Sequence, residues 1–130
     1  MNIQEATQYA NLQPAGFDLD AEIDQKVFGI VMSQKRVKST PRYSTNIADA
    51  FRIVEKLTTE SVGNVPLHFK LLYAWWPERT FPQIQARASF DWQLTGSDNE
   101  PLYQGEADTV PLAICRAALQ VVLTEEETNV

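Results

Sequence analysis

Two stretches of the chain decide the fold: Pro41-Arg-Tyr-Ser-Thr-Asn-Ile-Ala-Asp-Ala-Phe51 and Ala107-Asp-Thr-Val-Pro-Leu-Ala-Ile-Cys-Arg-Ala-Ala-Leu119. In each, polar turn residues precede apolar residues at helical spacing, which predicts a capped amphipathic helix. The expected N-caps are Ser44 or Thr45 in the first stretch and Asp108 or Thr109 in the second.

Both helices carry an apolar stripe that should be buried against a core. A further helix is expected over residues 17–28, where apolar residues recur at i, i+4 and i+8. Residues 1–16 form an N-terminal arm or a short helix, and residues 124–130 form an acidic tail that should fray because its charges oppose the helix dipole. The stripe residues are Ile47, Ala50, Phe51, Val54 and Leu57 in the first helix and Leu112, Cys115, Ala118, Leu119 and Val122 in the second.

Three segments show the alternation of apolar and polar residues that is typical of strands: 67–75, 84–94 and the short segment 101–107. Residues 30–32 are a candidate for a further strand edge. Short hairpins between these segments predict a small antiparallel sheet of three to four strands. Helices packed on this sheet give a single α+β domain over residues 1–130.

The charge of the chain restricts its partners. The 130 residues carry a net charge of −6, so attraction of the whole protein to nucleic acid or to an anionic membrane is not expected. The single cysteine excludes an intramolecular disulfide and fits a reducing compartment. The sequence has no leader-like N-terminus and no apolar run near the roughly 18 residues of a membrane span, so we expect a complete cytosolic protein.

The basic residues are concentrated in one window. Residues 26–47 contain no acid, but they hold Lys26, Lys35, Arg36, Lys38 and Arg42. A solvated loop and a site for an anion or phosphate are both consistent with this pattern.

Three blocks of the sequence carry a family resemblance. The first is Leu19-Asp-Ala-Glu-Ile-Asp-Gln-Lys-Val-Phe-Gly29, and the others are the turn-and-helix stretches over residues 41–56 and 107–119. With them the chain resembles the phage ABA sandwich domain family of small bacteriophage and prophage proteins, over about residues 19–122. It departs from the family pattern at Asn46, where Asp is usual, and at Phe51, where Trp is usual. The resemblance implies a phage or prophage origin, an α/β/α-type sandwich with three main helices, and no established enzyme activity.

The sequence contains none of the common catalytic, metal-binding or phosphate-binding motifs. His68 is the only histidine, whereas a metal site needs several such ligands. No base is placed beside a nucleophile, and Cys115 falls at a core-facing helix position, as a small apolar filler does. We therefore expect no enzyme activity, no metal and no cofactor.

A small anionic ligand is expected at the entrance of the helix that starts near Ser44, because a helix N-terminus presents N–H groups and partial positive charge. Arg42 would pair with a phosphate, Tyr43 would stack on a base or ribose, and Ser44 and Thr45 would donate hydrogen bonds. The same residues also suit ordinary helix capping, and the arginines suit surface ion pairs. The further candidates are Lys35, Arg36 and Lys38 for steering, Arg87 and Arg116 as secondary cations, Trp76 as an exposed aromatic and Asp108 as an acceptor for a sugar hydroxyl or base amine.

These observations favour a non-enzymatic phage or prophage accessory protein of the host bacterial cytoplasm. By analogy with other small phage proteins that counter host defence, the leading expectation for its function is sequestration of a small anionic, nucleotide-type ligand. The alternative is a protein-interaction or structural accessory that contacts a host or phage protein through its acidic helix or tail. Neither duplex nucleic acid nor a membrane is expected as a partner. A homodimer is expected because a three-stranded sheet leaves a free edge.

Overall fold

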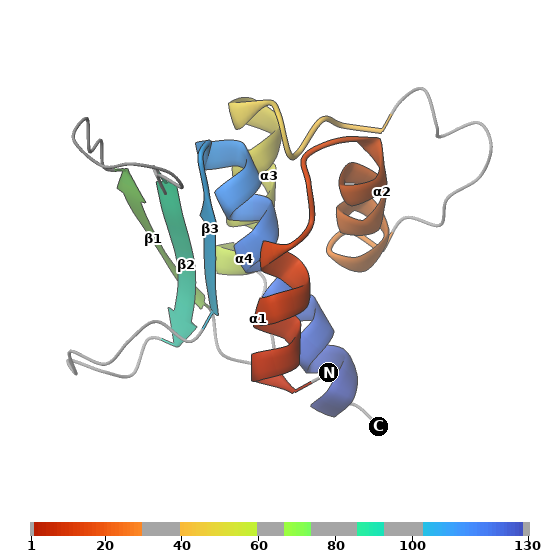
Figure 1. Ribbon diagram of the computed structural model, residues 1–130, viewed down its shortest axis with the longest axis vertical. Helices are drawn as coiled ribbons and strands as arrows, with labels where there is room; N and C mark the ends of the chain where they lie inside the picture. Colours follow the sequence, from red (N-terminus) through yellow and green to blue (C-terminus); the bar gives the residue numbers. More distant parts are fainter. Residues whose placement is uncertain (1, 30–39, 60–66, 74–85, 93–102, 129–130) are drawn as a thin grey trace.

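The computed structural model describes residues 2–29, 40–59, 67–73, 86–92 and 103–128. Figure 1 shows the strands gathered on one side of the molecule and the helices on the other. This arrangement confirms the α+β sandwich with a small antiparallel sheet. The elements, in chain order, are α1 (Ile3–Asn11), α2 (Phe17–Lys26), α3 (Ile47–Thr59), β1 (Leu67–Tyr73), β2 (Ala86–Trp92), β3 (Tyr103–Ala107) and α4 (Val110–Thr128).

The sheet has the order β1-β2-β3, and both strand pairs are antiparallel. Phe90 lies opposite Phe69 on β1 and opposite Tyr103 on β3, so three rings cross the sheet on its helix-facing side. Phe90 and Tyr103 are buried there, as predicted for an alternating strand. The second face exposes His68 and Arg87 among others, and within the described residues no helix lies on it.

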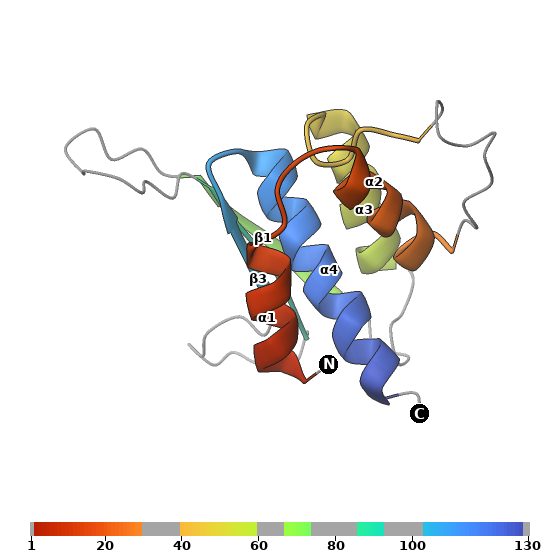
Figure 2. The same cartoon turned by 45° about the vertical axis from the view of Figure 1, so that its right-hand side comes forward.

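Helix α4 is the centre of the helical layer and contacts α1, α2 and α3 as well as β2 and β3 (Figure 2). Because neighbours surround it, α4 buries more than the predicted stripe, including Ile114, Ala117 and Val121. Cys115 is fully buried, and burial raises the pKa of its thiol well above the usual range, which fits an apolar filler. The backbone of α4 stays helical to Thr128, through the acidic residues expected to fray, because glutamate favours helix.

Strand β3 and helix α4 approach each other at Gly105. A Cβ atom at this position would collide with the backbone of α4, at the carbonyl oxygen of Ala113 and the amide nitrogen of Ala117. Small residues on both elements therefore set the spacing between the sheet and the helical layer.

The buried face of α3 differs from the predicted stripe. Ala50, Ile53 and Leu57 are buried, whereas Ile47 and Phe51 are 47% and 42% exposed. The prediction that Ile47 and Phe51 belong to the core is wrong. The helix turns the row Ala50, Ile53 and Leu57 toward the core instead, and these residues are spaced at i, i+3 and i+7. The Phe51 ring packs edge-on against Phe69 of β1, with 6.0 Å between ring centroids.

The outer edge of β3 is covered by side chains from α1 and α4. The Gln104 N–H donates to Oε1 of Gln120 at 3.0 Å, and the Gln120 amide nitrogen donates back to the Gln104 carbonyl. The Glu106 N–H donates to Oδ1 of Asn11 at 3.1 Å, and the Glu106 carbonyl accepts a hydrogen bond from Nη1 of Arg116 at 2.6 Å. These side chains take the place of a further strand, so β3 offers no unpaired backbone at Gln104 or Glu106.

Candidate functional site

The predicted ligand site is the turn over residues 42–46, just before α3, and two acids of α2 hold this turn in place. The Ser44 N–H donates to Oδ1 of Asp20 at 2.8 Å, and the Tyr43 hydroxyl donates to Oδ1 of Asp24 at 2.9 Å. Asp20 and Asp24 are four residues apart and therefore lie on one face of α2. Both are buried, so this face of α2 points inward although it holds two carboxyl groups.

A third hydrogen bond ties the turn to the linker between α1 and α2. The Gly16 N–H donates to Oγ of Ser44 at 2.9 Å. Gly16 has φ of 146°, in the region that side chains rarely allow, so glycine suits this position. Two segments that are 28 residues apart in sequence therefore meet at Ser44.

The N-cap of α3 is Asn46, and the predicted caps Ser44 and Thr45 are wrong. The Asp49 N–H donates to Oδ1 of Asn46 at 3.0 Å, and the Ala50 N–H donates to its backbone carbonyl. The Ser44 hydroxyl cannot cap the helix because it serves Gly16 instead. Asparagine is among the strongest N-cap residues, so Asn46 suits this position.

The polar groups of the predicted site have unequal access to solvent. Arg42 and Thr45 are exposed, whereas Tyr43 and Ser44 are buried. The Tyr43 ring stacks on Phe28, with 5.3 Å between centroids and 11° between planes. The predicted stacking of a ligand base on Tyr43 is therefore not compatible with this structure, because the residue is fully buried.

Arg116 does not join the turn as a ligand-binding cation. Its Nε and Nη2 donate to the Gln13 carbonyl at 3.0 and 2.8 Å, and its Nη1 donates to the Glu106 carbonyl. Burial lowers the pKa of this guanidinium, and the nearby Asp108 carboxylate acts in the opposite direction. Arg116 therefore connects the linker, β3 and α4, which is a structural task.

The other predicted residues do not converge on the turn. Arg87 lies on the second face of the sheet, with Nη2 at 3.2 Å from Oε1 of Glu106, its cross-strand neighbour. Asp108 is exposed between β3 and α4, with Thr109 in the N-cap position of α4. The segment 30–32 and the residues Lys35, Arg36, Lys38 and Trp76 lie outside the described residues.

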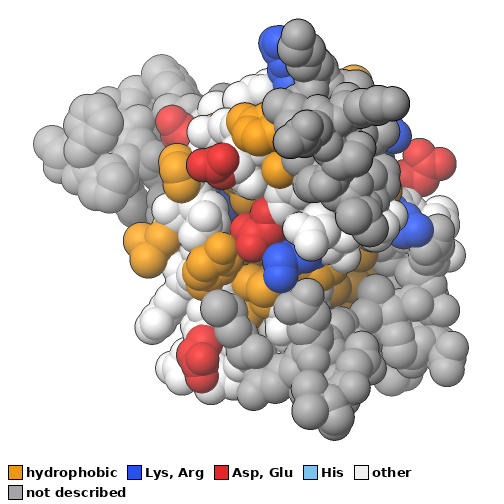
Figure 3. Space-filling model, turned by 90° about the vertical axis from the view of Figure 1, so that its right-hand side faces the viewer, with side chains coloured by type: hydrophobic (Ala, Val, Ile, Leu, Met, Phe, Trp, Pro, Cys, Tyr) orange, Lys and Arg blue, Asp and Glu red, His pale blue; other side chains and the backbone are white. Residues whose placement is uncertain are grey.

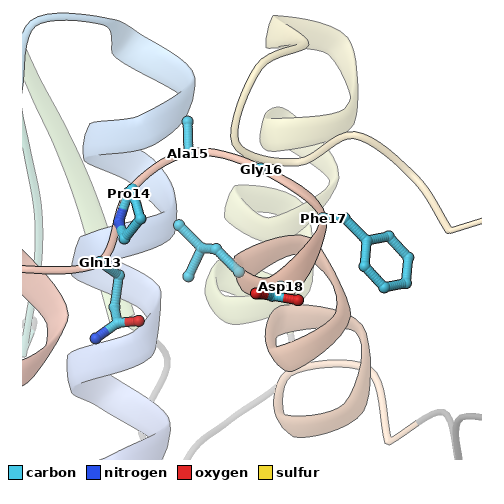
Figure 4. A pocket seen from close by; sticks show the side chains of 7 residues that line it. Gln13, Pro14, Ala15, Gly16, Phe17 and Asp18 are labelled. Carbon is cyan, nitrogen blue, oxygen red and sulfur yellow. The ribbon is translucent and has the colours of Figure 1, made fainter.

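A cavity of about 230 Å³ lies along the linker and the first turn of α2. In Figure 4 the linker arches from α1 to α2, with Asp18 below the arch and the Phe17 ring pointing away from it. The lining combines apolar groups, such as Pro14, with the exposed carboxylate of Asp18. The seven lining residues are Gln13, Pro14, Ala15, Gly16, Phe17, Asp18 and Leu19.

The charges around the turn are mixed. Burial raises the pKa of Asp20, and its hydrogen bonds from Ser44 partly offset this. Asp49 raises the same pKa and Arg42 lowers it, so both charges act on the buried acid. On the face shown in Figure 3, the acidic and basic side chains that are coloured lie scattered among hydrophobic ones. Among the described residues, an anion bound at this turn would therefore meet carboxylates as well as the Arg42 guanidinium.

Sequence reasoning missed the residues that build this site. Asp20 and Asp24 are not among the predicted site residues, although their spacing of four residues places them on one face of α2. Gly16 and Asn46 were visible as residues that favour special turns and helix caps. Among the described residues, no three His, Cys, Asp or Glu side chains gather as metal ligands would, and no helix has the length and apolar character of a membrane span.

The fold and the 42–46 turn define a small α+β sandwich with a tightly held helix entrance. The sequence model of the Phage ABA sandwich domain matches residues 22–119, which is most of the chain. This protein belongs to that phage-associated family. No curated protein and no solved structure matches the chain.

Proposed function

We propose that this protein is a non-enzymatic phage or prophage accessory protein that sequesters a small anionic, nucleotide-type ligand in the host cytoplasm. In this role it would counter a host defence that signals through such a ligand. The hydrogen bond between Gly16 and Ser44 is the observation that supports the proposal. It holds the turn that carries the exposed Arg42 next to the linker that lines the cavity.

The phosphate would bind to the Arg42 guanidinium, whose fork suits two phosphate oxygens. The phosphate would not bind at the N-terminus of α3 itself, because the Asp49 carboxylate lies in the first turn of that helix. This carboxylate accepts a hydrogen bond of 3.0 Å from the backbone N–H of Arg42 and would repel a phosphate. Thr45 is exposed beside Arg42 and adds a hydroxyl donor. Lys35, Arg36 and Lys38 precede this turn in the sequence and would attract the ligand from solution.

The cavity would take the base or the sugar. Its volume of about 230 Å³ is below the range of about 300–1,000 Å³ typical of drug-sized ligands, so it has room for no more than a nucleoside. The Asp18 carboxylate is an acceptor for a sugar hydroxyl or a base amine. Tyr43 and Ser44 would not touch the ligand; they fix the backbone that presents Arg42.

Titration calorimetry with AMP, a cyclic dinucleotide and inorganic phosphate tests this function. Arg42→Ala should weaken binding of the preferred nucleotide by about tenfold or more, because a charge-assisted contact is lost. Its free energy of unfolding should change by less than about 0.5 kcal/mol, as for an exposed side chain. Arg87→Ala is the matched control, because it removes an exposed arginine from the sheet face that points away from the helices and from the 42–46 turn. Equal affinity of Arg42→Ala and the parent, or no binding of any probe, would refute the proposal.

One observation favours the alternative, a protein-interaction accessory. Large apolar side chains are exposed on α3 and on β1, two elements that contact each other, and such exposure is typical of a contact surface. Mass spectrometry of the protein purified from infected cells separates the two functions. A retained nucleotide supports sequestration, whereas a stoichiometric second polypeptide, lost on Phe51→Ser, supports the alternative.

A further inference from the structure

We propose that two copies of this chain associate through the outer edge of β1, so that two three-stranded sheets join into one of six strands. The contact surface is the β1 strip, defined as the β1 backbone edge with Ile47, Phe51, Leu71 and Leu72. This inference is independent of the ligand proposed above, because the strip lies on different elements from the linker and the 42–46 turn.

The two edges of the sheet differ. The edge of β3 is closed by Gln120, Asn11 and Arg116, which bind its outward N–H and carbonyl groups. For β1, the described part of the chain contains a partner strand on one side only, which is β2. Figure 1 shows β1 as the outermost strand of the sheet. A strand with an open edge is a template for pairing with another strand.

Apolar side chains flank this edge on both faces of the sheet. Leu71 points to the helix-facing side and is 37% exposed, and Leu72 points to the other side and is 50% exposed. Phe51 and Ile47, one helical turn apart on α3, extend the apolar surface beyond Leu71. The edge-on contact between Phe51 and Phe69 fixes this part of α3 to β1.

The apolar side chains of the strip would supply about a third to a half of the surface that a stable dimer buries. Four large side chains exposed to this degree amount to about 300–400 Å² per copy, near the largest apolar patch of a typical monomer. Two facing copies would bury about 700 Å² of apolar side-chain surface, and a stable interface of about 1,200–2,000 Å² would be completed by the paired backbone and a polar rim.

The Lys70 charge disfavours one register of self-pairing and permits others, among them the register centred on Leu71. A two-fold axis normal to the sheet at Leu71 places Lys70 opposite Leu72 of the second copy, so no like charges face each other. An axis at Lys70 would place two ammonium groups opposite each other, which destabilises a cross-strand pair. The axis at Leu71 also brings the two α3 helices to the same side of the joined sheet, so that Phe51 and Ile47 of both copies can meet.

Sedimentation equilibrium over about 1–200 µM tests the proposal, because this range covers dissociation constants in the micromolar range. The parent should reach twice the mass of one chain, and Leu72→Lys should raise the dimer dissociation constant at least tenfold. Leu12→Lys is the matched control, because Leu12 is 79% exposed at the end of α1, away from β1. It should behave as the parent does. Urea unfolding of all three proteins checks that loss of the dimer is not loss of the fold.

Hydrogen exchange adds a second readout. Backbone amides of β1 should exchange more slowly at high than at low protein concentration, whereas those of β3 should not change. A parent that stays monomeric across the range would overturn the proposal. A dimer that Leu72→Lys leaves intact would overturn it as well. The same holds if the β1 strip binds a phage or host polypeptide while the free chain is monomeric.

Discussion

The hydroxyl of Tyr43 donates a hydrogen bond of 2.9 Å to Oδ1 of Asp24, and both side chains are fully buried. The contact joins the middle of α2 to the turn before α3. Together with the stacking of Tyr43 on Phe28, it anchors the turn from inside the protein. The buried acid is therefore part of the structure that presents Arg42.

Tyr43→Phe should lower the free energy of unfolding by about 1–3 kcal/mol, because Asp24 loses a buried donor while the stacked ring remains. Urea unfolding monitored by circular dichroism measures the change. Tyr9→Phe is the control: it removes a hydroxyl that contacts Glu22 in a partly exposed position, so its effect should be smaller. An unchanged Tyr43→Phe variant would mean that the hydroxyl contributes nothing to stability.

The variant Asp20→Asn tests how the buried carboxyl group affects the pH dependence of the free energy of unfolding. Burial raises the pKa of Asp20, so the folded protein binds this proton more tightly than the unfolded chain does. This carboxyl therefore lowers stability as pH rises from about 3.9, the unfolded value, through the raised folded pKa. Asparagine keeps an acceptor for the Ser44 N–H but carries no charge.

The stability of Asp20→Asn relative to the parent should therefore increase through this pH window and level off above it. Below the window the two proteins should differ least, because Asp20 is then neutral in both states. Urea unfolding of both proteins at several values between pH 3.5 and 7 measures the difference. A difference that stays constant with pH would show that the Asp20 pKa is not raised.

Gln120→Leu should open the covered edge of β3. The side chain keeps a similar volume but loses its paired hydrogen bonds to the N–H and carbonyl of Gln104. We expect a loss of about 2–4 kcal/mol in unfolding free energy and faster exchange of the Gln104 amide hydrogen. Gln8→Leu, at an exposed position of α1, should change neither quantity appreciably. Unchanged exchange at Gln104 would contradict the proposed role of Gln120.

Gly105→Ala should be among the most damaging single-methyl changes in the protein. The added Cβ would meet the backbone of α4, which cannot move aside as a flexible side chain can. We expect a loss of about 1–3 kcal/mol or more, seen as a lower thermal midpoint. Gly29→Ala serves for comparison, because its φ of 69° is strained for alanine but no atom lies within 4 Å of the new Cβ. A smaller effect at Gly105 than at Gly29 would refute the close-approach argument.

Local sequence patterns predicted most of the elements. The alternation of apolar and polar residues identified β1, β2 and β3, and apolar residues at helical spacing identified α2, α3 and α4. These patterns are visible in the sequence because the repeat of two residues in a strand and of 3.6 residues in a helix follows from backbone geometry. The face that α3 buries was predicted less well. Ile47 and Phe51 fit the apolar stripe, but the packing of α3 beside β1 leaves both at the surface.

The contacts of the site could not be predicted from local patterns. Ser44 looked like a helix cap, yet its hydroxyl and N–H bind Gly16 and Asp20, which are distant in sequence. Arg116 looked like a free cation beside a buried stripe, yet three of its nitrogens bind backbone carbonyls. Such pairings follow from which elements become neighbours, and a single sequence does not encode that in its periodicity.

The covered edge of β3 also determines how far association can proceed. In the proposed dimer the two β1 strands occupy the centre, and the described sheet then terminates at both ends in a β3 strand. Because Gln120 and Asn11 have already bound the outward backbone of β3, a third copy finds no strand to extend. Assembly would thus be self-limiting and would stop at two copies.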